Sequence, residues 1–392
     1  MPCRKFRADY LFTGIDLLSS NSVLVTDEKG KVEDIINVDD AGEDVETFTG
    51  LLCPGFINAH CHVELSHLKD KIAENTGLAE FVYRVVNERH YPTEDIENAI
   101  KLAVEEMTQN GIVAVGDICN NELTIDSKNE AQLRFYNFIE VSGWNPSIAQ
   151  ERFEKSKAIY DKYIQNNKEA SMVPHAPYSV SYPLWEKITP FFSHKVVTIH
   201  NLETKDENKF FLEGKGDLIR MYEMMKIDNS FYNFLGTSSI QSYFKKMDNA
   251  SSVILVHNTF INQDDLDYIF KVKPASQLVS FCLCPNANIY IENTLPPVLM
   301  LLDNGVNIVI GTDSLASNHQ LDILEELKTI SKNFPAVTTI MMLEWATLNG
   351  AKALQMENIL GSFDKGKQPG IVLIENLEGY KLKSDSKAKR LL

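Results

Sequence analysis

From about residue 50 onward, short apolar runs rich in β-branched residues alternate with longer segments of helical periodicity. This alternation is typical of repeated strand–helix units, whose strands build a parallel sheet. We predict strands over residues 51–62, 111–117, 135–141, 170–176, 195–200, 251–257, 278–285 and 306–313. Eight strands, each followed by helical material, specify a closed (β/α)₈ barrel better than an open sheet, so we expect an α/β fold of the TIM-barrel type.

Two of the intervening segments show the clearest helical pattern, residues 93–110 and 320–333. Thr93 is placed to cap the start of the first, and Gly111 follows its end, where glycine commonly terminates a helix. Both segments are therefore predicted to be helices between strands.

The two ends of the chain differ from this middle part. Residues 5–50 contain short alternating stretches separated by turn-forming residues, which is typical of antiparallel hairpins, and residues 361–382 have the same character. We therefore expect a small β-sandwich domain built from residues 1–52 and 355–392, flanking a barrel over residues 53–354. A chain of 392 residues is long enough for both.

The net charge limits the classes of partner, and the cysteine usage indicates the cellular compartment. The 38 Lys and Arg against 54 Asp and Glu give a formal net charge of -16, which would repel a nucleic-acid backbone or an anionic membrane. No run approaches the roughly 20 apolar residues needed to span a bilayer. The six cysteines lack paired spacing and follow no hydrophobic leader, which predicts a reducing, cytoplasmic setting. The expected partner is a small molecule, and the assembly state, a homodimer included, is left open.

Four histidines and one aspartate fall at predicted strand ends. His60 and His62 lie two apart at the end of the first strand, where alternate side chains point to the same face. His200 and His257 close the fifth and sixth strands, and Asp313 closes the eighth. Since the carboxyl ends of barrel strands form the mouth where active sites are built, these side chains are predicted to share one site.

This set has the chemistry of a catalytic metal centre. Two imidazoles from the first strand, one from the fifth and a carboxylate from the eighth leave a position open for water, as catalytic zinc requires. No lysine ends the fourth strand to bridge two ions, so we predict one divalent metal, zinc first and iron as the alternative. Glu203, three residues after His200, is predicted to shuttle protons for the activated water, and His257 to donate a hydrogen bond to the attacking oxygen or to the substrate.

Four further residues are candidates for substrate binding, each with a simpler alternative. Glu64 continues the alternation of the first strand, and a solvated loop carboxylate is the other interpretation. His175 closes the fourth strand, where a structural hydrogen bond is the alternative. Tyr178 and Asn318 are weaker candidates, because an ordinary surface or packing role explains each of them better than substrate binding does.

The motifs PGFINAHCH, HAPYS, HNLET, VHNTF, CPNAN and GTDSLASNHQLDIL follow one another along the chain. In this order the chain resembles the amidohydrolase superfamily, and within it the single-metal branch of S-adenosylhomocysteine, guanine and aminodeoxyfutalosine deaminases and triazine hydrolases. The resemblance implies metal ligands at His60, His62, His200 and Asp313, with Glu203 and His257 as the catalytic pair. It also implies hydrolytic deamination of an aminated heterocycle such as a purine or purine nucleoside, in which Glu203 protonates the ring nitrogen and Asp313 helps pass a proton to departing ammonia.

Two positions depart from the family pattern. A histidine usually stands two residues before the proline of CPNAN and a serine before its last asparagine, where this chain has Leu283 and Ala287. Two alternatives stay open. The first is hydrolysis of a chlorinated ring or cyclic amide at the same site, and the second is an inactive metal-binding scaffold. Product mass separates the enzymatic alternatives, since deamination exchanges an amine for oxygen whereas ring opening adds a whole water.

Overall fold

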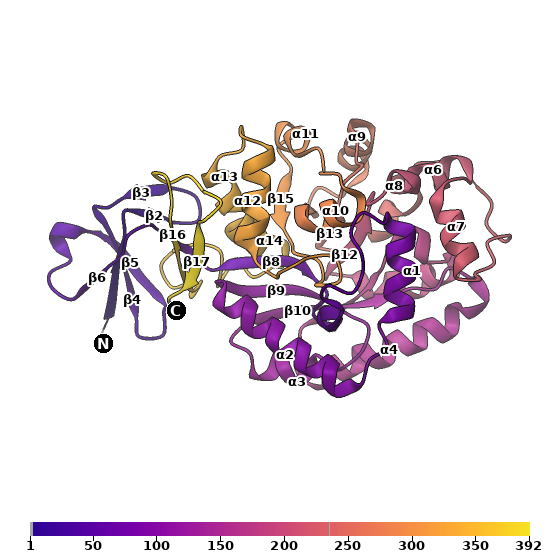
Figure 1. Cartoon of the computed structure of the whole chain (residues 1–392), viewed down its shortest axis with the longest axis horizontal. Helices are drawn as coiled ribbons and strands as arrows, with labels where there is room; N and C mark the ends of the chain where they lie inside the picture. Colours follow the sequence, from indigo (N-terminus) through magenta and orange to yellow (C-terminus); the bar gives the residue numbers. More distant parts are fainter. Residues whose placement is uncertain (1–2, 235) are drawn as a thin grey trace.

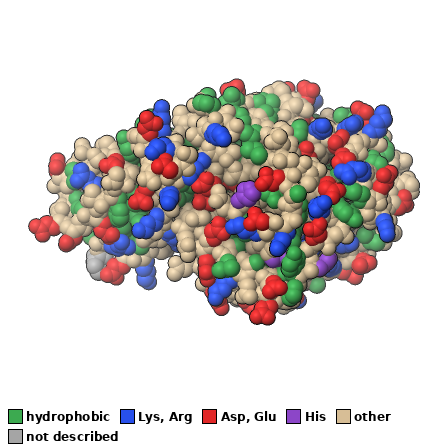
Figure 2. Space-filling view, in the orientation of Figure 1, with side chains coloured by type: hydrophobic (Ala, Val, Ile, Leu, Met, Phe, Trp, Pro, Cys, Tyr) green, Lys and Arg blue, Asp and Glu red, His purple; other side chains and the backbone are tan. Residues whose placement is uncertain are grey.

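The structure is a computed structural model that describes residues 3–234 and 236–392. Figure 1 shows a small β-rich part, which carries both chain ends, beside a larger part in which helices surround the strands. On the face drawn in Figure 2, acidic and basic side chains are interspersed. Within the two described ranges, no helix combines the length and the apolar character that a membrane crossing requires.

The strands divide between the two parts. Those of the small part are β1 (Cys3–Arg7), β2 (Tyr10–Phe12), β3 (Leu17–Ser19), β4 (Ser22–Asp27), β5 (Val32–Asn37), β6 (Val45–Thr47), β7 (Leu51–Pro54), β16 (Ile371–Glu375) and β17 (Lys387–Arg390). Those of the large part are β8 (Phe56–Cys61), β9 (Ile112–Cys119), β10 (Arg134–Val141), β11 (Ala170–Pro174), β12 (Val196–Asn201), β13 (Ser252–His257), β14 (Leu278–Leu283) and β15 (Asn307–Ile310).

The α-helices belong to the large part. They are α1 (Leu78–Glu88), α2 (Thr93–Gln109), α3 (Ile125–Glu130), α4 (Ala149–Gln165), α5 (Tyr182–Ile188), α6 (Lys205–Glu213), α7 (Asp217–Met224), α8 (Ser239–Tyr243), α9 (Gln263–Val272), α10 (Pro285–Glu292), α11 (Val298–Asp303), α12 (Ile323–Asn333), α13 (Thr339–Glu344) and α14 (Gly350–Ala353). Strands and helices therefore alternate through the large part, as the sequence predicts.

The strands of the large part form two four-stranded parallel sheets, in the orders β8-β9-β10-β11 and β12-β13-β14-β15. Backbone hydrogen bonds join the sheets at both seams. The N–H of His200 donates to the carbonyl of His175 over 3.0 Å, and the N–H of Asp313 donates to the carbonyl of His60 over 3.1 Å. All eight predicted strands are present, and their carboxyl ends lie on the same side.

The first predicted strand, residues 51–62, is in fact two strands. Gly55 separates β7, which pairs with β2 and β16 in the small part, from β8, which pairs with β9. A side chain at Gly55 would place its Cβ 2.2 Å from Val113 Cγ1 and 2.7 Å from the Pro369 carbonyl oxygen, so only glycine allows this close approach. The predicted division between residues 52 and 53 falls within β7, and the predicted domain bounds stay a prediction.

The small part consists of two sheets, in the orders β5-β4-β1-β6 and β17-β16-β7-β2-β3. Both contribute to one apolar cluster, for example Phe6 and Leu24 from the first sheet and Leu52 and Leu373 from the second. Strands from both ends of the chain therefore meet in one small β part, and its description as a β-sandwich domain stays a prediction. Not all of its strand pairs are antiparallel, since β1 runs parallel to β6 and β2 to β7.

Both predicted helices are present, but the structure corrects one detail at the start of each. Thr93 does not cap α2, because the chain is extended at Pro92 and Thr93 is already the first helical residue. Gly111 follows the helix end in a left-handed conformation at φ +85°, as predicted. The helix expected over residues 320–333 begins later, at Ile323, because the Asp322 carboxylate accepts a hydrogen bond from Leu324 N over 2.8 Å and caps the start there.

Candidate metal centre and active site

The carboxyl ends of the large part's strands bring together the five residues predicted for the metal site. His60 lies in β8 and His62 directly follows it, His200 lies in β12, His257 ends β13, and Asp313 follows β15. All five are buried. Parallel strands thus gather side chains that are up to 253 positions apart in the sequence, from His60 to Asp313, into one cluster.

The distances within the cluster are those of groups facing a common point. Asp313 Oδ1 lies 3.5 Å from His60 Nε2 and 3.4 Å from His62 Nε2. His62 Nε2 lies 3.3 Å from His200 Nε2. The ligand atoms of His60, His200, His257 and Asp313 all lie within 4.8 Å of one another. His257 therefore shares this group with three of the four predicted ligands, and His62 is not part of it.

The backbone is strained where these side chains leave the strands. His257 has φ +70°, Asp313 has φ +57° and Leu202, next to Glu203, has φ +46°. A left-handed conformation costs a non-glycine residue about 1–2 kcal/mol, and such strain gathers at functional sites. The strained residues here turn one imidazole and two carboxylates, including that of Glu203, toward the same buried space.

Unpartnered nitrogen atoms show that the cluster suits a metal ion. Within the described part of the chain, Nδ1 and Nε2 of His60 and Nε2 of His257 are buried without a hydrogen-bond partner. Because buried polar atoms are nearly always paired, such atoms call for a partner that the protein does not supply. Imidazole nitrogens with a carboxylate oxygen form the donor set that zinc and similar divalent ions bind.

The charge states of these groups also favour a cation. Burial lowers the pKa of the His60 and His62 imidazoles, and burial together with the neighbouring histidines holds that of His200 well below its usual value. Burial alone would raise the pKa of Asp313, but the surrounding imidazoles outweigh it and hold the pKa well below its usual value. Ser317 Oγ donates to Asp313 Oδ2 over 2.5 Å, which fixes the carboxylate with Oδ1 toward the histidines.

Glu203 stands beside this cluster as a carboxyl group able to carry a proton. Its Oε1 lies 3.6 Å from His257 Nε2. Burial, and next the nearby charge of Asp313, raise the pKa of Glu203 well above its usual value. His257 Nδ1 donates to Asn288 Oδ1 over 2.9 Å, so the neutral imidazole turns the lone pair of Nε2 toward Glu203 and the cluster.

Glu64 and His175 lie in hydrogen-bond networks at the same end of the sheets. Arg89 Nη2 donates to Glu64 Oε1 over 3.1 Å, and Asn120 N donates to Oε2 over 2.8 Å, so both carboxylate oxygens have protein partners. His175 Nδ1 donates to Glu140 Oε1 over 2.7 Å, and its side chain is 23% exposed, which leaves part of the ring accessible.

Tyr178 and Asn318 differ in what they offer a ligand. The Tyr178 hydroxyl is buried without a partner among the described residues, whereas its backbone carbonyl accepts from the Tyr222 hydroxyl. Asn318 Nδ2 donates to the Thr312 carbonyl over 2.9 Å and to Glu326 Oε1 over 2.7 Å. The Asn318 amide nitrogen therefore holds the turn before Asp313, while the Tyr178 hydroxyl is free to bind.

An apolar cluster, which we call the mouth cluster, covers this end of the sheets. It combines side chains from α1, α6 and α7 with residues that follow the strands. Its members include Leu65, Leu78, Phe81, Trp144, Tyr178, Phe210, Tyr222 and Tyr290. Trp144 stacks on Tyr222 with ring centroids 5.7 Å apart and planes 9° apart. An aromatic surface therefore lies beside the polar centre.

Comparison with known proteins identifies the family. A family model described as the amidohydrolase family matches residues 51–389, most of the chain. The chain belongs to the amidohydrolase family. As a member, it is a hydrolytic enzyme, and its buried histidine–aspartate group is a metal-binding one.

Curated relatives and solved structures agree with this membership. The adenosine deaminase of Helicobacter pylori is 26% identical over 319 residues, which cover 79% of this chain and 75% of that protein. The 5-methylthioadenosine/S-adenosylhomocysteine deaminase of Pyrococcus abyssi is 27% identical, over 96% of this chain and 85% of that protein. This amidohydrolase shares its fold with the crystal structure of the Helicobacter pylori aminofutalosine deaminase in complex with methylthio-coformycin, at a TM-score of 0.82, 22% identity, and coverage of 99% and 100% of the two chains.

An adenosine deaminase from Xanthomonas campestris with bound zinc has a TM-score of 0.70 and 21% identity, over 94% of this amidohydrolase and 84% of that chain. At this identity the likeness concerns the fold alone.

The two positions that depart from the family motifs, Leu283 and Ala287, are buried side chains in the main apolar core.

The sequence pattern does not single out three further polar residues of this amidohydrolase, Glu140, Asn288 and Asp117. Glu140 binds His175, and Asn288 binds His257. Asp117 Oδ1 accepts from Val63 N over 2.8 Å, just behind His62, while its Oδ2 pairs with buried Lys128 Nζ at 2.5 Å. A polar residue inside an otherwise apolar strand was the available signal for Glu140 and Asp117.

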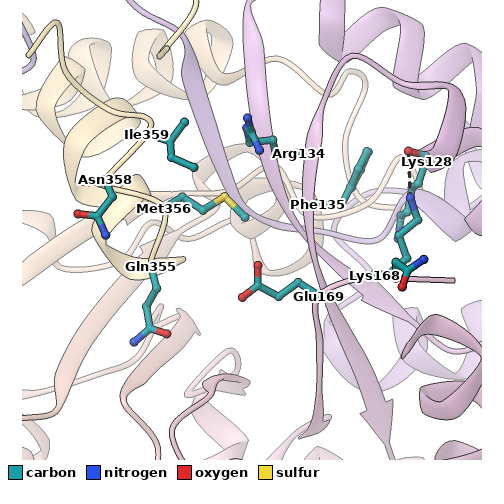
Figure 3. Close-up of a pocket in the computed structure, with 10 residues that line it drawn as sticks. Lys128, Arg134, Phe135, Lys168, Glu169, Gln355, Met356, Asn358 and Ile359 are labelled. Carbon is teal, nitrogen blue, oxygen red and sulfur yellow. Dashed lines mark hydrogen bonds between the residues drawn. The ribbon is translucent and has the colours of Figure 1, made fainter. Parts of the chain in front are cut away.

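An open pocket also lies elsewhere on the described chain. A pocket of about 360 Å³ is lined by Lys128, Arg134, Phe135, Asn167, Lys168, Glu169, Gln355, Met356, Asn358 and Ile359. Figure 3 shows the segment 355–359 on one side of it and residues at the amino ends of β10 and β11 on the other. It therefore opens at the opposite end of the sheets from the metal cluster, and none of the predicted site residues lines it.

Proposed function

We propose that this amidohydrolase is a metal-dependent deaminase that replaces the amino group of a purine-nucleoside-like substrate with oxygen from water. The observation that carries the proposal is the buried cluster of imidazoles and one carboxylate beside Glu203, a carboxyl group 3.6 Å from His257 whose pKa is raised by burial. The relatives from Helicobacter pylori, Pyrococcus abyssi and Nitratiruptor are deaminases of adenosine, 5-methylthioadenosine/S-adenosylhomocysteine and aminodeoxyfutalosine, which supports this substrate class.

We propose that His60, His62, His200 and Asp313 hold one divalent ion, for which zinc is our first choice. We also propose that the parallel strands form a closed (β/α)₈ barrel, flanked by a β-sandwich. The seam hydrogen bonds between the two parallel sheets support closure. The zinc-bound Xanthomonas structure supports the choice of zinc. When bound, such an ion supplies the activation of water to a nucleophile at neutral pH.

The protein's own groups then move the protons. The water oxygen must first bond to the ring carbon, with one water proton passing to the ring nitrogen. The other proton then reaches the leaving amine, the C–N bond breaks and ammonia departs. Glu203 carries a proton to the ring nitrogen, and Asp313 helps transfer one to the ammonia. His257, which donates from Nδ1 to Asn288, accepts a hydrogen bond from the attacking water at Nε2. The donor role expected from the sequence would require a second proton on this imidazole.

The substrate would lie between the cluster and the aromatic surface at the mouth. Among the predicted binding residues, His175 and Tyr178 offer groups to the substrate, His175 through its exposed ring edge and Tyr178 through its unpartnered hydroxyl. Glu64 and Asn318 act on the substrate only indirectly, because their polar atoms hold neighbouring protein groups. The six free cysteines, five of them buried, are consistent with the cytoplasmic setting that we include in the proposal.

Ammonia release tests this function. Zinc-loaded protein is incubated with adenosine, 5-methylthioadenosine, S-adenosylhomocysteine, adenine, guanine and a chlorinated triazine, and ammonia, chloride and product mass are measured. We expect ammonia in equal amount to the oxo product from at least one adenine nucleoside, with no release after chelation. Chloride release alone, or no release from any compound, would contradict the proposal.

A further inference from the structure

Glu140 places a carboxylate inside an apolar strand. It lies near the carboxyl end of β10, between the buried residues Ile139 and Val141, and its side chain is 8% exposed. Burying an ionised carboxylate is costly unless it is paired and hydrogen-bonded. Both of its oxygens are in fact occupied: His175 Nδ1 donates to Oε1 over 2.7 Å, and Asn120 Nδ2 donates to Oε2 over 3.0 Å.

The bond to Glu140 determines how His175 can be used. An imidazole that donates from Nδ1 to a fixed carboxylate has its tautomer and ring plane set by that bond. Nε2, on the other side of the ring, is then the nitrogen available to a ligand. The side chain of His175 is 23% exposed, more than those of His60, His62, His200 and His257, which range from 0% to 8%. Of the histidines gathered here, His175 is the most accessible.

The same carboxylate connects to residues on both sides. The His175 carbonyl accepts from His200 Nδ1 over 2.7 Å, so the position of His175 also bears on that imidazole. On the other side Asn120, which binds Glu140, donates its backbone N–H to Glu64, and Glu64 pairs with Arg89. Glu140 is therefore the central member of a network that crosses the ends of β8, β9, β10 and β11.

We propose that Glu140 is a positioning residue for the reaction: it holds His175 with Nε2 toward the substrate, and Asn120 in turn holds Glu140. The inference rests on the proposed function, in which His175 contacts the substrate. Burial alone would raise the pKa of Glu140, but the charge and hydrogen bond of His175 outweigh it, so the pKa is lowered and the carboxylate keeps its charge.

A metal ligand is the competing role for Glu140, because its carboxylate, His175 and His200 lie within 4.8 Å of one another. The hydrogen bonds argue against it. His175 Nδ1 donates to Glu140 itself, and His200 Nδ1 donates to a carbonyl, so both nitrogens carry protons and neither offers a lone pair to a second ion.

A double-mutant cycle on the zinc-loaded enzyme tests the inference. Glu140→Gln keeps the size of the side chain and removes its charge, and we expect it to lower kcat/KM for the best nucleoside by about 10- to 100-fold with one zinc per chain retained. In a His175→Ala background the same substitution should change kcat/KM by less than about twofold, because the group it positions is gone. Glu169→Gln, at the amino end of β11 beside the Figure 3 pocket, is the matched control and should behave as wild type.

Three results would overturn the inference. Full additivity of the two substitutions would mean that Glu140 acts independently of His175. Loss of a second metal ion in Glu140→Gln would make it a ligand, and unchanged kcat/KM would remove any role. If Glu140→Gln does not fold, Asn120→Ala takes its place, since it removes only the Nδ2 bond to the carboxylate; the expected loss is about tenfold and should likewise vanish with His175→Ala.

Crystal structures of the wild type and Glu140→Gln separate this inference from the proposed function. Silence of the wild type toward every nucleoside contradicts the function, and the structures then decide the positioning role alone. We expect the His175 ring in Glu140→Gln to leave its wild-type orientation. An unchanged ring with an intact Nδ1 bond would contradict the positioning role even if the wild type deaminates nucleosides.

Discussion

The two ends of the parallel sheets carry different chemistry. At the carboxyl ends, imidazoles and carboxylates are buried together, and several of the imidazole nitrogen atoms lack a partner among the described residues. At the amino ends lies an open pocket of about 360 Å³, bordered by charged side chains such as Arg134, Lys168 and Glu169. The reactive groups thus lie at the opposite end of the sheets from this pocket. Unpartnered buried polar atoms, and not this pocket, mark the candidate site.

The largest loss of activity is expected from removing an imidazole of the cluster at the carboxyl ends. His200→Ala should lose the bound zinc and lower deamination by at least about 10³-fold, since a metal ion contributes several kcal/mol to such a reaction. Metal content by elemental analysis and ammonia release at saturating nucleoside measure the two effects. Zinc bound at the wild-type level with activity intact would show that the centre lies elsewhere.

Lys128 connects the two ends, and its removal should affect stability. Its ammonium pairs with buried Asp117, which holds Val63 N behind His62, while Lys128 also borders the pocket at the amino ends. Lys128→Met leaves the Asp117 carboxylate buried without its cation, which should lower the free energy of unfolding by about 3–5 kcal/mol. Urea denaturation of both proteins gives the difference. A loss below about 1 kcal/mol would mean that the Lys128–Asp117 ion pair contributes little to the stability of the protein.

The site could be predicted from the sequence because its residues lie at the ends of strands. Strand periodicity placed His200 and Asp313 at strand ends, and parallel strands bring their carboxyl ends together whatever the helices between them do. The partner of Asp117 could not be predicted in this way, because Lys128 reaches it only through the packing of α3 on β9. The same holds for Asn318, whose amide is occupied by Glu326 of α12.

Other features could not be predicted from the sequence, because they depend on contacts between residues that lie far apart in the sequence. The break at Gly55 results from the approach of Val113 and Pro369, which no local pattern reveals. The mouth cluster unites α1 with α6 and α7, and Glu140 is balanced by His175 from the next strand. Fold class and metal cluster therefore follow from periodicity and strand ends, whereas the groups that orient them follow from tertiary packing.

The Tyr178 hydroxyl gives a smaller and more selective test of the carboxyl end. Because this hydroxyl is buried without a partner, Tyr178→Phe should leave the free energy of unfolding unchanged or slightly raised. If the hydroxyl binds substrate, KM should rise about tenfold, the value of one hydrogen bond of about 1.4 kcal/mol. Steady-state kinetics and urea denaturation separate the two effects, and a destabilised protein with unchanged KM would assign Tyr178 to packing.

The smallest effect is expected at the pocket in Figure 3. Arg134→Gln removes a charge from its lining and should change kcat/KM by no more than about twofold, in keeping with a surface substitution away from the site. The same nucleoside assay measures it. A loss as large as that of a residue near the cluster would mean that the pocket at the amino ends takes part in the reaction.

We propose that Glu203 carries protons beside a metal centre which it does not help to hold. Zinc content and ammonia release of Glu203→Gln, measured on the same preparation, test it most directly. We predict zinc at the wild-type level and a rate lower by about 10²- to 10⁴-fold, the contribution of general acid–base catalysis. Loss of zinc together with activity, or a rate close to that of the wild type, would contradict the account.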